Sequence, residues 1–159
     1  MAVTSDIVQS WRSPRAVIRR HLLRYPTEGF ALSLLVAFLL LAFVAQWPAM
    51  SRAAFLAPEA PLTQRMVATG LALLASIPLW YGLAGLSHFV AGRFGGMGSY
   101  LGARVALFWA LLCVAPFMLV HGMISGFAGP GIVTTVAGVL VLGGFLVLWV
   151  NMLIASEKT

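Results

Sequence analysis

The side chains that could do chemistry are few in this chain, and they are widely spaced. There are one cysteine, three histidines and four carboxylates among 159 residues. The single Cys113 has no partner for a disulfide, and a lone thiol most often packs as a small apolar side chain. Neither His88 nor His121 has a Cys, Asp or Glu at the spacing of a zinc site. The acids, none of them next to a Ser/His pair, are Asp6, Glu28, Glu59 and Glu157. We therefore expect no metal, no cofactor and no enzymatic activity.

The segment 92–104, GRFGGMGSYLGAR, has the composition of a phosphate-binding loop but not its spacing. It lacks the Lys-Ser/Thr ending of a P-loop, and the step from Gly98 to Gly102 is one residue longer than G-x-G-x-x-G requires. It also follows an apolar helix instead of a strand. We expect a flexible turn between two helices.

The elements that must position these residues are four long apolar runs without any acidic or basic side chain: residues 29–47, 66–91, 105–124 and 131–155. Each can cross a hydrocarbon core of about 30 Å as a helix. A hydrophobic fraction of 61 % and a mean hydropathy of +0.98 exclude an ordinary soluble domain. The predicted fold is an all-α membrane protein, a four-helix transmembrane bundle that forms a single domain over residues 1–159.

The distribution of charge predicts the orientation of this bundle. Of the ten Lys and Arg residues, only Arg52 and Arg65 lie between the first and second runs, and none lies between the third and fourth. The other eight flank the opposite ends of the runs. By the positive-inside rule, both termini are expected in the cytoplasm, most naturally at a bacterial inner membrane.

Residues 1–27 precede the first run and are rich in arginine. The pair Ser13-Pro14 is typical of a helix start, so we expect two short helices. Val17 and Ile18 lie on an apolar face of the second, which predicts a basic amphipathic helix in the membrane interface. Its expected contacts are anionic lipid head groups or a partner protein. The candidate contact residues are Arg12, Arg15, Arg19, Arg20 and Arg24.

Small residues at four-residue spacing predict where the spans pack closely, because lipid supplies no hydrophobic force between helices. The candidate packing residues are Ala68, Ala72 and Ser76 in the second span, Gly102, Ala106 and Ala110 in the third, and Gly138 in the fourth. His88, Tyr100 and Asn151 are expected to meet at the cytoplasmic side as a polar cluster that ties helices together.

Two stretches resemble the bacterial branch of the Yip family (Ypt/Rab-interacting-protein family). They are WRSPRAVIRR at 11–20, similar to the basic lead of these proteins, and GGMGSYLGARVALFWALLCVAPF at 95–117, similar to their Gly/Tyr loop before a Pro-bearing span. The resemblance implies a non-enzymatic polytopic membrane protein; eukaryotic members act with prenylated Rab GTPases. Family members usually have five spans, and this chain has four predicted ones. The Asp-Leu-Tyr-Gly-Pro type motif is absent, so Rab binding is not expected.

Three function classes follow from these features. The first is a Yip-like protein that acts through helix packing and contacts with lipid or partners, the partners being other membrane proteins or further copies of the chain. The second is an accessory subunit of a respiratory, photosynthetic or transport complex. The third is a small transporter or channel, since Pro78 and Pro116 interrupt two spans at similar depth. No nucleic acid is expected as a partner, because the cations flank membrane spans.

Overall fold

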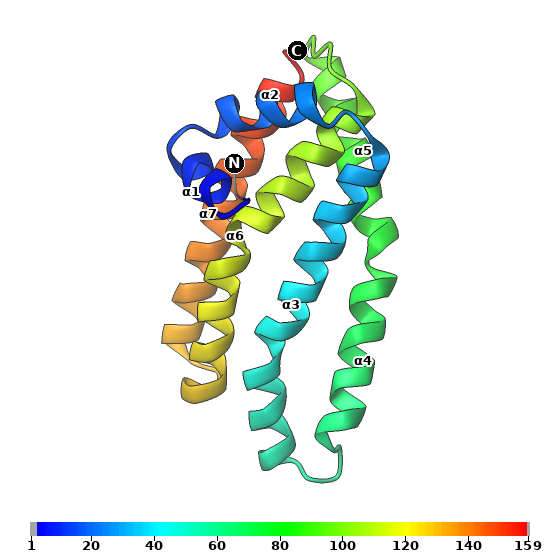
Figure 1. The fold of residues 1–159 in the computed structure, drawn as a ribbon. Helices are drawn as coiled ribbons and strands as arrows, with labels where there is room; N and C mark the ends of the chain where they lie inside the picture. The colour runs from blue at the N-terminus through cyan, green and yellow to red at the C-terminus, as the bar shows by residue number, and fades with distance from the viewer. Residues whose placement is uncertain (1–2, 159) are drawn as a thin grey trace.

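The computed structural model describes residues 3–158, and this part of the chain is helical without any strand (Figure 1). The helices are α1 (Val3–Arg12), α2 (Pro14–Arg24), α3 (Glu28–Leu56), α4 (Leu62–Ala75), α5 (Ile77–Arg93), α6 (Tyr100–Ala128) and α7 (Ile132–Ser156). Four segments are long and apolar enough to cross a membrane. They are α3, the pair α4–α5 taken as one segment, α6, and α7. The predicted all-helical fold, with four helical segments long and apolar enough to cross a membrane, is therefore confirmed.

Local capping explains where two of the spans begin. The Thr27 hydroxyl accepts the N–H of Phe30 at 3.2 Å before α3, and the Ser99 hydroxyl accepts the N–H of Gly102 at 3.0 Å before α6. α3 ends at Leu56, well beyond the predicted boundary at residue 47. The helix continues through Pro48 because the residues after it are good helix formers and pack against α6.

The second span is interrupted between α4 and α5. Pro78 cannot donate the backbone hydrogen bond that a continuous helix requires, so the chain turns at Ser76. The Ser76 hydroxyl donates to Leu73 O at 2.6 Å and accepts the indole N–H of Trp80 at 3.1 Å. Ser76 therefore supports the break itself, a role different from the predicted packing of small residues.

α6 is the central helix of the bundle. Its first half, from Val105 to Ala115, is almost completely buried, whereas no residue of α4 is fully buried. Pro116 lies inside α6, and Figure 1 shows that the helix bends along its length. α1 and α2 lie against α6 and α7 in the upper part of the view.

α3 and α6 cross at very short distance on one side of the bundle. A Cβ added to Gly122 would lie 1.8 Å from the backbone O of Ala45, and one added to Gly126 would lie 2.4 Å from Cβ of Pro48. Only glycine allows this approach at either position. The pair forms a G-x-x-x-G pattern, the spacing that lets membrane helices pack backbone to backbone.

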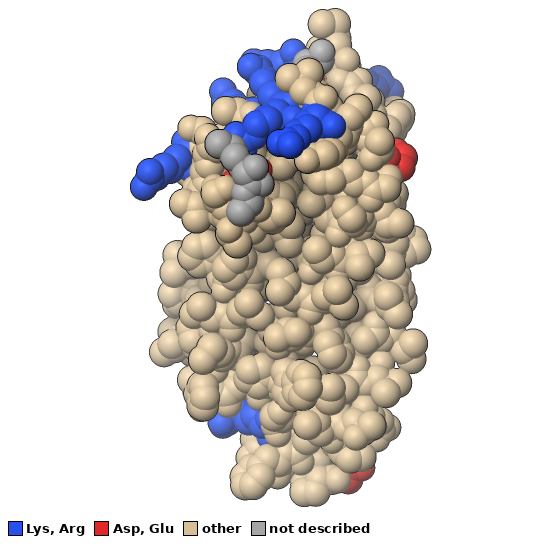
Figure 2. All heavy atoms as spheres, in the orientation of Figure 1, with Lys and Arg blue, Asp and Glu red and all other residues tan. Residues whose placement is uncertain are grey.

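The two ends of the bundle differ in charge. We call the end that includes α1, α2, the α5–α6 connection and the end of α7 the basic end, because eight of the ten cations belong to it. Figure 2 shows Lys and Arg gathered there, with a smaller basic patch at the opposite end. The first described helix, α1, and the end of α7 both belong to the basic end (Figure 1).

Candidate functional site

The basic arm α1–α2 packs against the bundle through a buried polar centre. The indole N–H of Trp109 in α6 donates to the Ser10 hydroxyl at 2.9 Å, and that hydroxyl donates to the backbone O of Asp6 at 2.8 Å. Ser10 and Trp109 are 0 % and 1 % exposed. Because all of these donors and acceptors are satisfied, α1 can be buried against α6 without the desolvation cost of an unpaired polar group.

The charge of Asp6 is compensated from α2. Its Oδ1 accepts from Arg20 Nη2 at 2.6 Å, while Arg20 also donates to Gln9 Oε1 at 3.2 and 3.3 Å. His21 Nε2 lies 3.7 Å from Asp6 Oδ2, and its ring centroid lies 4.3 Å from that of Trp109. This cluster locks α1 to α2 and places both over α6.

His21 is buried in this arrangement, which has an electrostatic consequence. Burial lowers the pKa of His21 below its ordinary value of 6.5, because the charged imidazolium is poorly solvated there. Asp6 opposes this shift, whereas Arg20 and Arg24 add to it. The neutral imidazole is thus the form that suits the packed arm.

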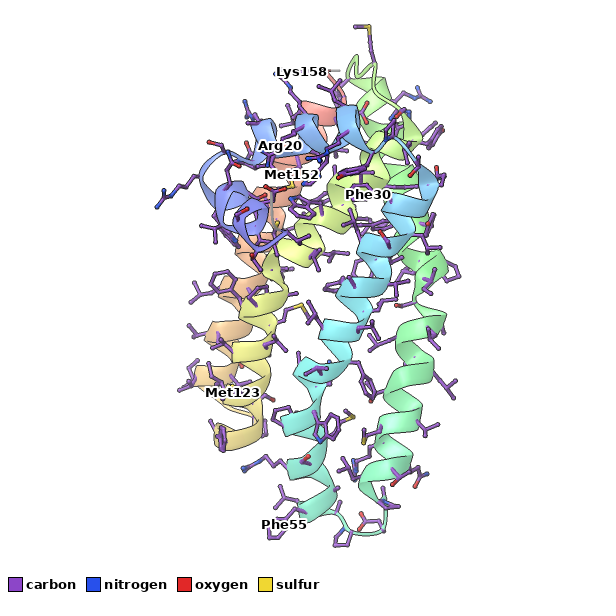
Figure 3. The ribbon with its side chains drawn as sticks, viewed as in Figure 1. Arg20, Phe30, Phe55, Met123, Met152 and Lys158 are labelled. Carbon is purple, nitrogen blue, oxygen red and sulfur yellow. The ribbon has the colours of Figure 1, made fainter. Side chains whose placement is uncertain are left out.

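Apolar contacts also hold the arm against α6 and α7. Val17 and Ile18 are both 0 % exposed. The apolar face predicted to lie on lipid is therefore covered by protein, in a buried cluster that includes Trp109 of α6. Trp11 packs edge-on to Phe117 with ring centroids 5.1 Å apart. Met152 of α7, labelled in Figure 3, is also 0 % exposed and belongs to the same buried apolar cluster as Val17 and Ile18.

The five arginines predicted to contact lipid or a partner fall into two groups. Arg12, Arg15, Arg19 and Arg24 are exposed. Of these, Arg15 also donates to Asn151 Oδ1 of α7, from Nη2 at 3.0 Å and Nε at 3.2 Å. Arg20 is turned inward to Asp6, so its guanidinium is engaged within the arm. The predicted contact role of the exposed arginines stays a prediction.

The predicted polar cluster forms with one change of membership. His88 and Tyr100 do meet, with ring centroids 4.4 Å apart. The third member is Glu157, whose Oε1 lies 2.8 Å from His88 Nδ1. Asn151 was wrongly placed in this cluster, because it bonds Arg15 and the backbone O of Val147 instead.

Glu157 also explains the glycine-rich loop between α5 and α6. Its Oε2 accepts the N–H of Gly98 at 3.2 Å, and its backbone O accepts the N–H of Met97 at 2.9 Å. A Cβ on Gly98 would lie 2.5 Å from the backbone O of Ser156, and one on Gly96 would lie 2.7 Å from Glu157 Oε2. The glycines allow the loop to close over the end of α7, a structural role instead of phosphate binding.

The residues predicted to pack between helices are buried in α6 but exposed in α4. Gly102, Ala106 and Ala110 of α6 are buried, and a Cβ on Gly102 would meet Ser156 of α7 at 3.4 Å. Gly138 lies against His121, whose Nε2 would be 3.2 Å from an added Cβ. Ala68 and Ala72 of α4 are exposed, so no other helix among residues 3–158 covers them.

Several contributors were not singled out from the sequence. The G-x-x-x-G spacing of Gly122 and Gly126 was a detectable signal. Ser10 and Trp109 gave none, because their hydrogen bond joins segments 99 residues apart. The pairing of Asp6 with Arg20 gave none either, because it depends on how α1 and α2 fold against each other.

These contacts hold the arm and the helices of the bundle together. Among residues 3–158, no group of three or more His, Cys, Asp or Glu could hold a metal ion. Ser10 is engaged with Trp109 and its own helix, and Asp6 with Arg20, so their geometry is that of a helix clamp.

Comparisons with known proteins found no match among protein-family models, curated proteins or solved structures.

Proposed function

We propose that this chain is a non-enzymatic, Yip-like membrane protein that acts through helix packing and through contacts of its basic arm with anionic lipid and membrane partners. The observation that supports this most directly is the docked arm. Asp6, Ser10 and Arg20 hold α1–α2 against the bundle, and Arg12, Arg19 and Arg24 are exposed on its outer side. Fixed cations at a membrane surface contribute about 1 kcal/mol each toward anionic lipid.

The proposed orientation places the basic end in the cytoplasm of a bacterial cell, at the inner membrane. It rests on the eight cations of that end against Arg52 and Arg65 at the other. Reporter fusions at the C-terminus and within the α3–α4 connection test it. Cytoplasmic reporter activity from the connection would contradict the orientation.

The arm proposal is tested by replacing Arg12, Arg19 and Arg24 together with Gln. Arg15 and Arg20 stay, because they hold the arm in place. We expect the triple variant to bind phosphatidylglycerol more weakly and to lose proteins that co-purify from native membranes. Arg65→Gln, at the opposite end, is the matched control. A triple variant with the parent's lipids and co-purifying proteins would refute the proposal.

An accessory subunit of a larger membrane complex is a second candidate, supported by the outer face of α4. Ala68 and Ala72 offer a small-residue stripe without a partner helix among the described residues. A bulky Ala72→Phe substitution should then release the chain from its complex without unfolding it. Retention at fixed stoichiometry would exclude packing through this face.

A further inference from the structure

A cavity lies at the end of the bundle opposite the basic arm, between α3, α6 and α7. Its volume is about 540 Å³, within the range of about 300–1,000 Å³ typical of ligand sites. Its walls are mainly apolar and include Ala49, Ala53 and Leu56 of α3 and Gly138 of α7. It is separate from every contact used in the proposed function.

One cation, Arg52, lines this cavity. Its Nη1 lies 3.3 Å from the backbone O of Phe127 and 3.5 Å from that of Gly126, so it caps the end of α6. Its Nε is covered by the protein and cannot reach a ligand, whereas its Nη2 makes no hydrogen bond among the described residues. A guanidinium has five N–H donors, so this one has donors left for an anion.

The rest of the lining supplies no carboxylate that would compete for Arg52. The hydroxyl of Thr134 donates to Gly129 O at 2.6 Å, and that of Thr135 donates to Gly131 O at 3.0 Å. His121 Nε2 lies 3.2 Å from Thr134 O, and a carbonyl can only accept, so this ring nitrogen donates. Arg52 is the one Lys or Arg side chain among the lining residues.

Two further features fit an anionic lipid. α7 begins at the cavity without a side-chain cap at Gly131, so its first N–H groups and positive helix end favour an anion. Arg52 is four residues from the end of α3, about 6 Å along the axis, a depth at which arginine reaches lipid phosphates.

We propose that this cavity binds one anionic phospholipid, with its phosphate at Arg52 and one acyl chain along the apolar wall of Ala49 and Ala53. The guanidinium Nη2 provides the charge-assisted hydrogen bond, and the small side chains leave room for the chain. We propose an anionic lipid over a zwitterionic one because the lining has no carboxylate to pair with the ammonium group of a zwitterionic headgroup.

The test uses the full chain in phosphatidylcholine vesicles containing a minor fraction of phosphatidylglycerol with a photoreactive diazirine in its acyl chain. Crosslinked peptides are identified by mass spectrometry. We expect labelling of residues 49–56, reduced about tenfold by Arg52→Gln, since a hydrogen bond to a charged group has about that effect on affinity. Arg65→Gln, which removes a cation of the same end outside the cavity, should leave the labelling unchanged.

A second variant tests the apolar wall proposed to hold the acyl chain and leaves Arg52 unchanged. Ala53→Phe fills the cavity and should also abolish labelling, while helix content by circular dichroism stays that of the parent. Parent-level labelling in Ala53→Phe overturns the proposal, even if Arg52→Gln fails to fold. If inorganic phosphate alone competes with the labelling, the cavity is a site for a free anion, and the proposal is overturned. If the variants change the oligomeric state without loss of labelling, the cavity contacts a second copy of the chain, and the proposal is equally overturned.

Discussion

The substitution Gly122→Ala tests the close crossing of α3 and α6. In the structure, the new Cβ would lie 1.8 Å from the backbone O of Ala45 and 2.8 Å from its carbonyl carbon, whereas ordinary contacts begin at 3.4 Å. The obstructing atoms are backbone, so no side chain can rotate away. α3 and α6 must separate locally to admit one methyl group.

The loss of stability expected for Gly122→Ala can be worked out by comparison with a second glycine. A Cβ on Gly143 of α7 meets nothing within 4 Å. Both Gly→Ala substitutions gain about 1 kcal/mol of helix propensity, so this term cancels between them. The remaining difference is the steric cost, about 1–3 kcal/mol for overpacking and at the upper end here because backbone is displaced.

The assay is thermal unfolding of both purified variants and the parent in one detergent, followed by circular dichroism. We expect Gly143→Ala to match or exceed the parent and Gly122→Ala to unfold at a lower temperature. For a chain of this size, about 2–4 °C per kcal/mol is the expected scale. Equal midpoints for the two variants would refute the crossing geometry, since helix propensity alone treats both sites alike.

Three more outcomes are expected. Asp6→Asn should weaken docking of the arm by about 1–3 kcal/mol, because it removes a charge-assisted hydrogen bond, and trypsin should then cleave the arm faster. Docking of the arm should also depend on pH, because burial lowers the pKa of His21 below 6.5 in the docked arm. The released arm then binds more protons than the docked arm, so docking is at full strength above pH 6.5 and weakens as the pH falls below that value. Faster trypsin cleavage from pH 7 to pH 5 in the parent but not in His21→Phe would show this, and a flat parent profile would contradict it. Gly98→Ala should destabilise the chain, because its Cβ would lie 2.5 Å from Ser156 O, whereas Gly92→Ala, with nothing within 4 Å, should not; indistinguishable melting curves would speak against the loop geometry.

The sequence alone determined that four helices of membrane length form and where they lie. In a bilayer core, backbone groups must bond within their own segment, so an uncharged run of sufficient length becomes a helix whatever surrounds it. Ser13-Pro14 and Pro78 likewise marked real breaks, because proline acts locally. The continuation of α3 through Pro48 shows the limit of that local rule.

Only the tertiary structure decided which faces meet. Ala68 and Ala72 have the same spacing as Ala106 and Ala110, yet the first pair is exposed and the second is buried. Lipid tails are as apolar as a protein core, so hydropathy cannot distinguish a lipid-facing stripe from a packed one. The sequence likewise could not pair Asp6 with the α2 cations or Glu157 with the α5 histidine, because such contacts depend on how the bent α6 brings distant segments together.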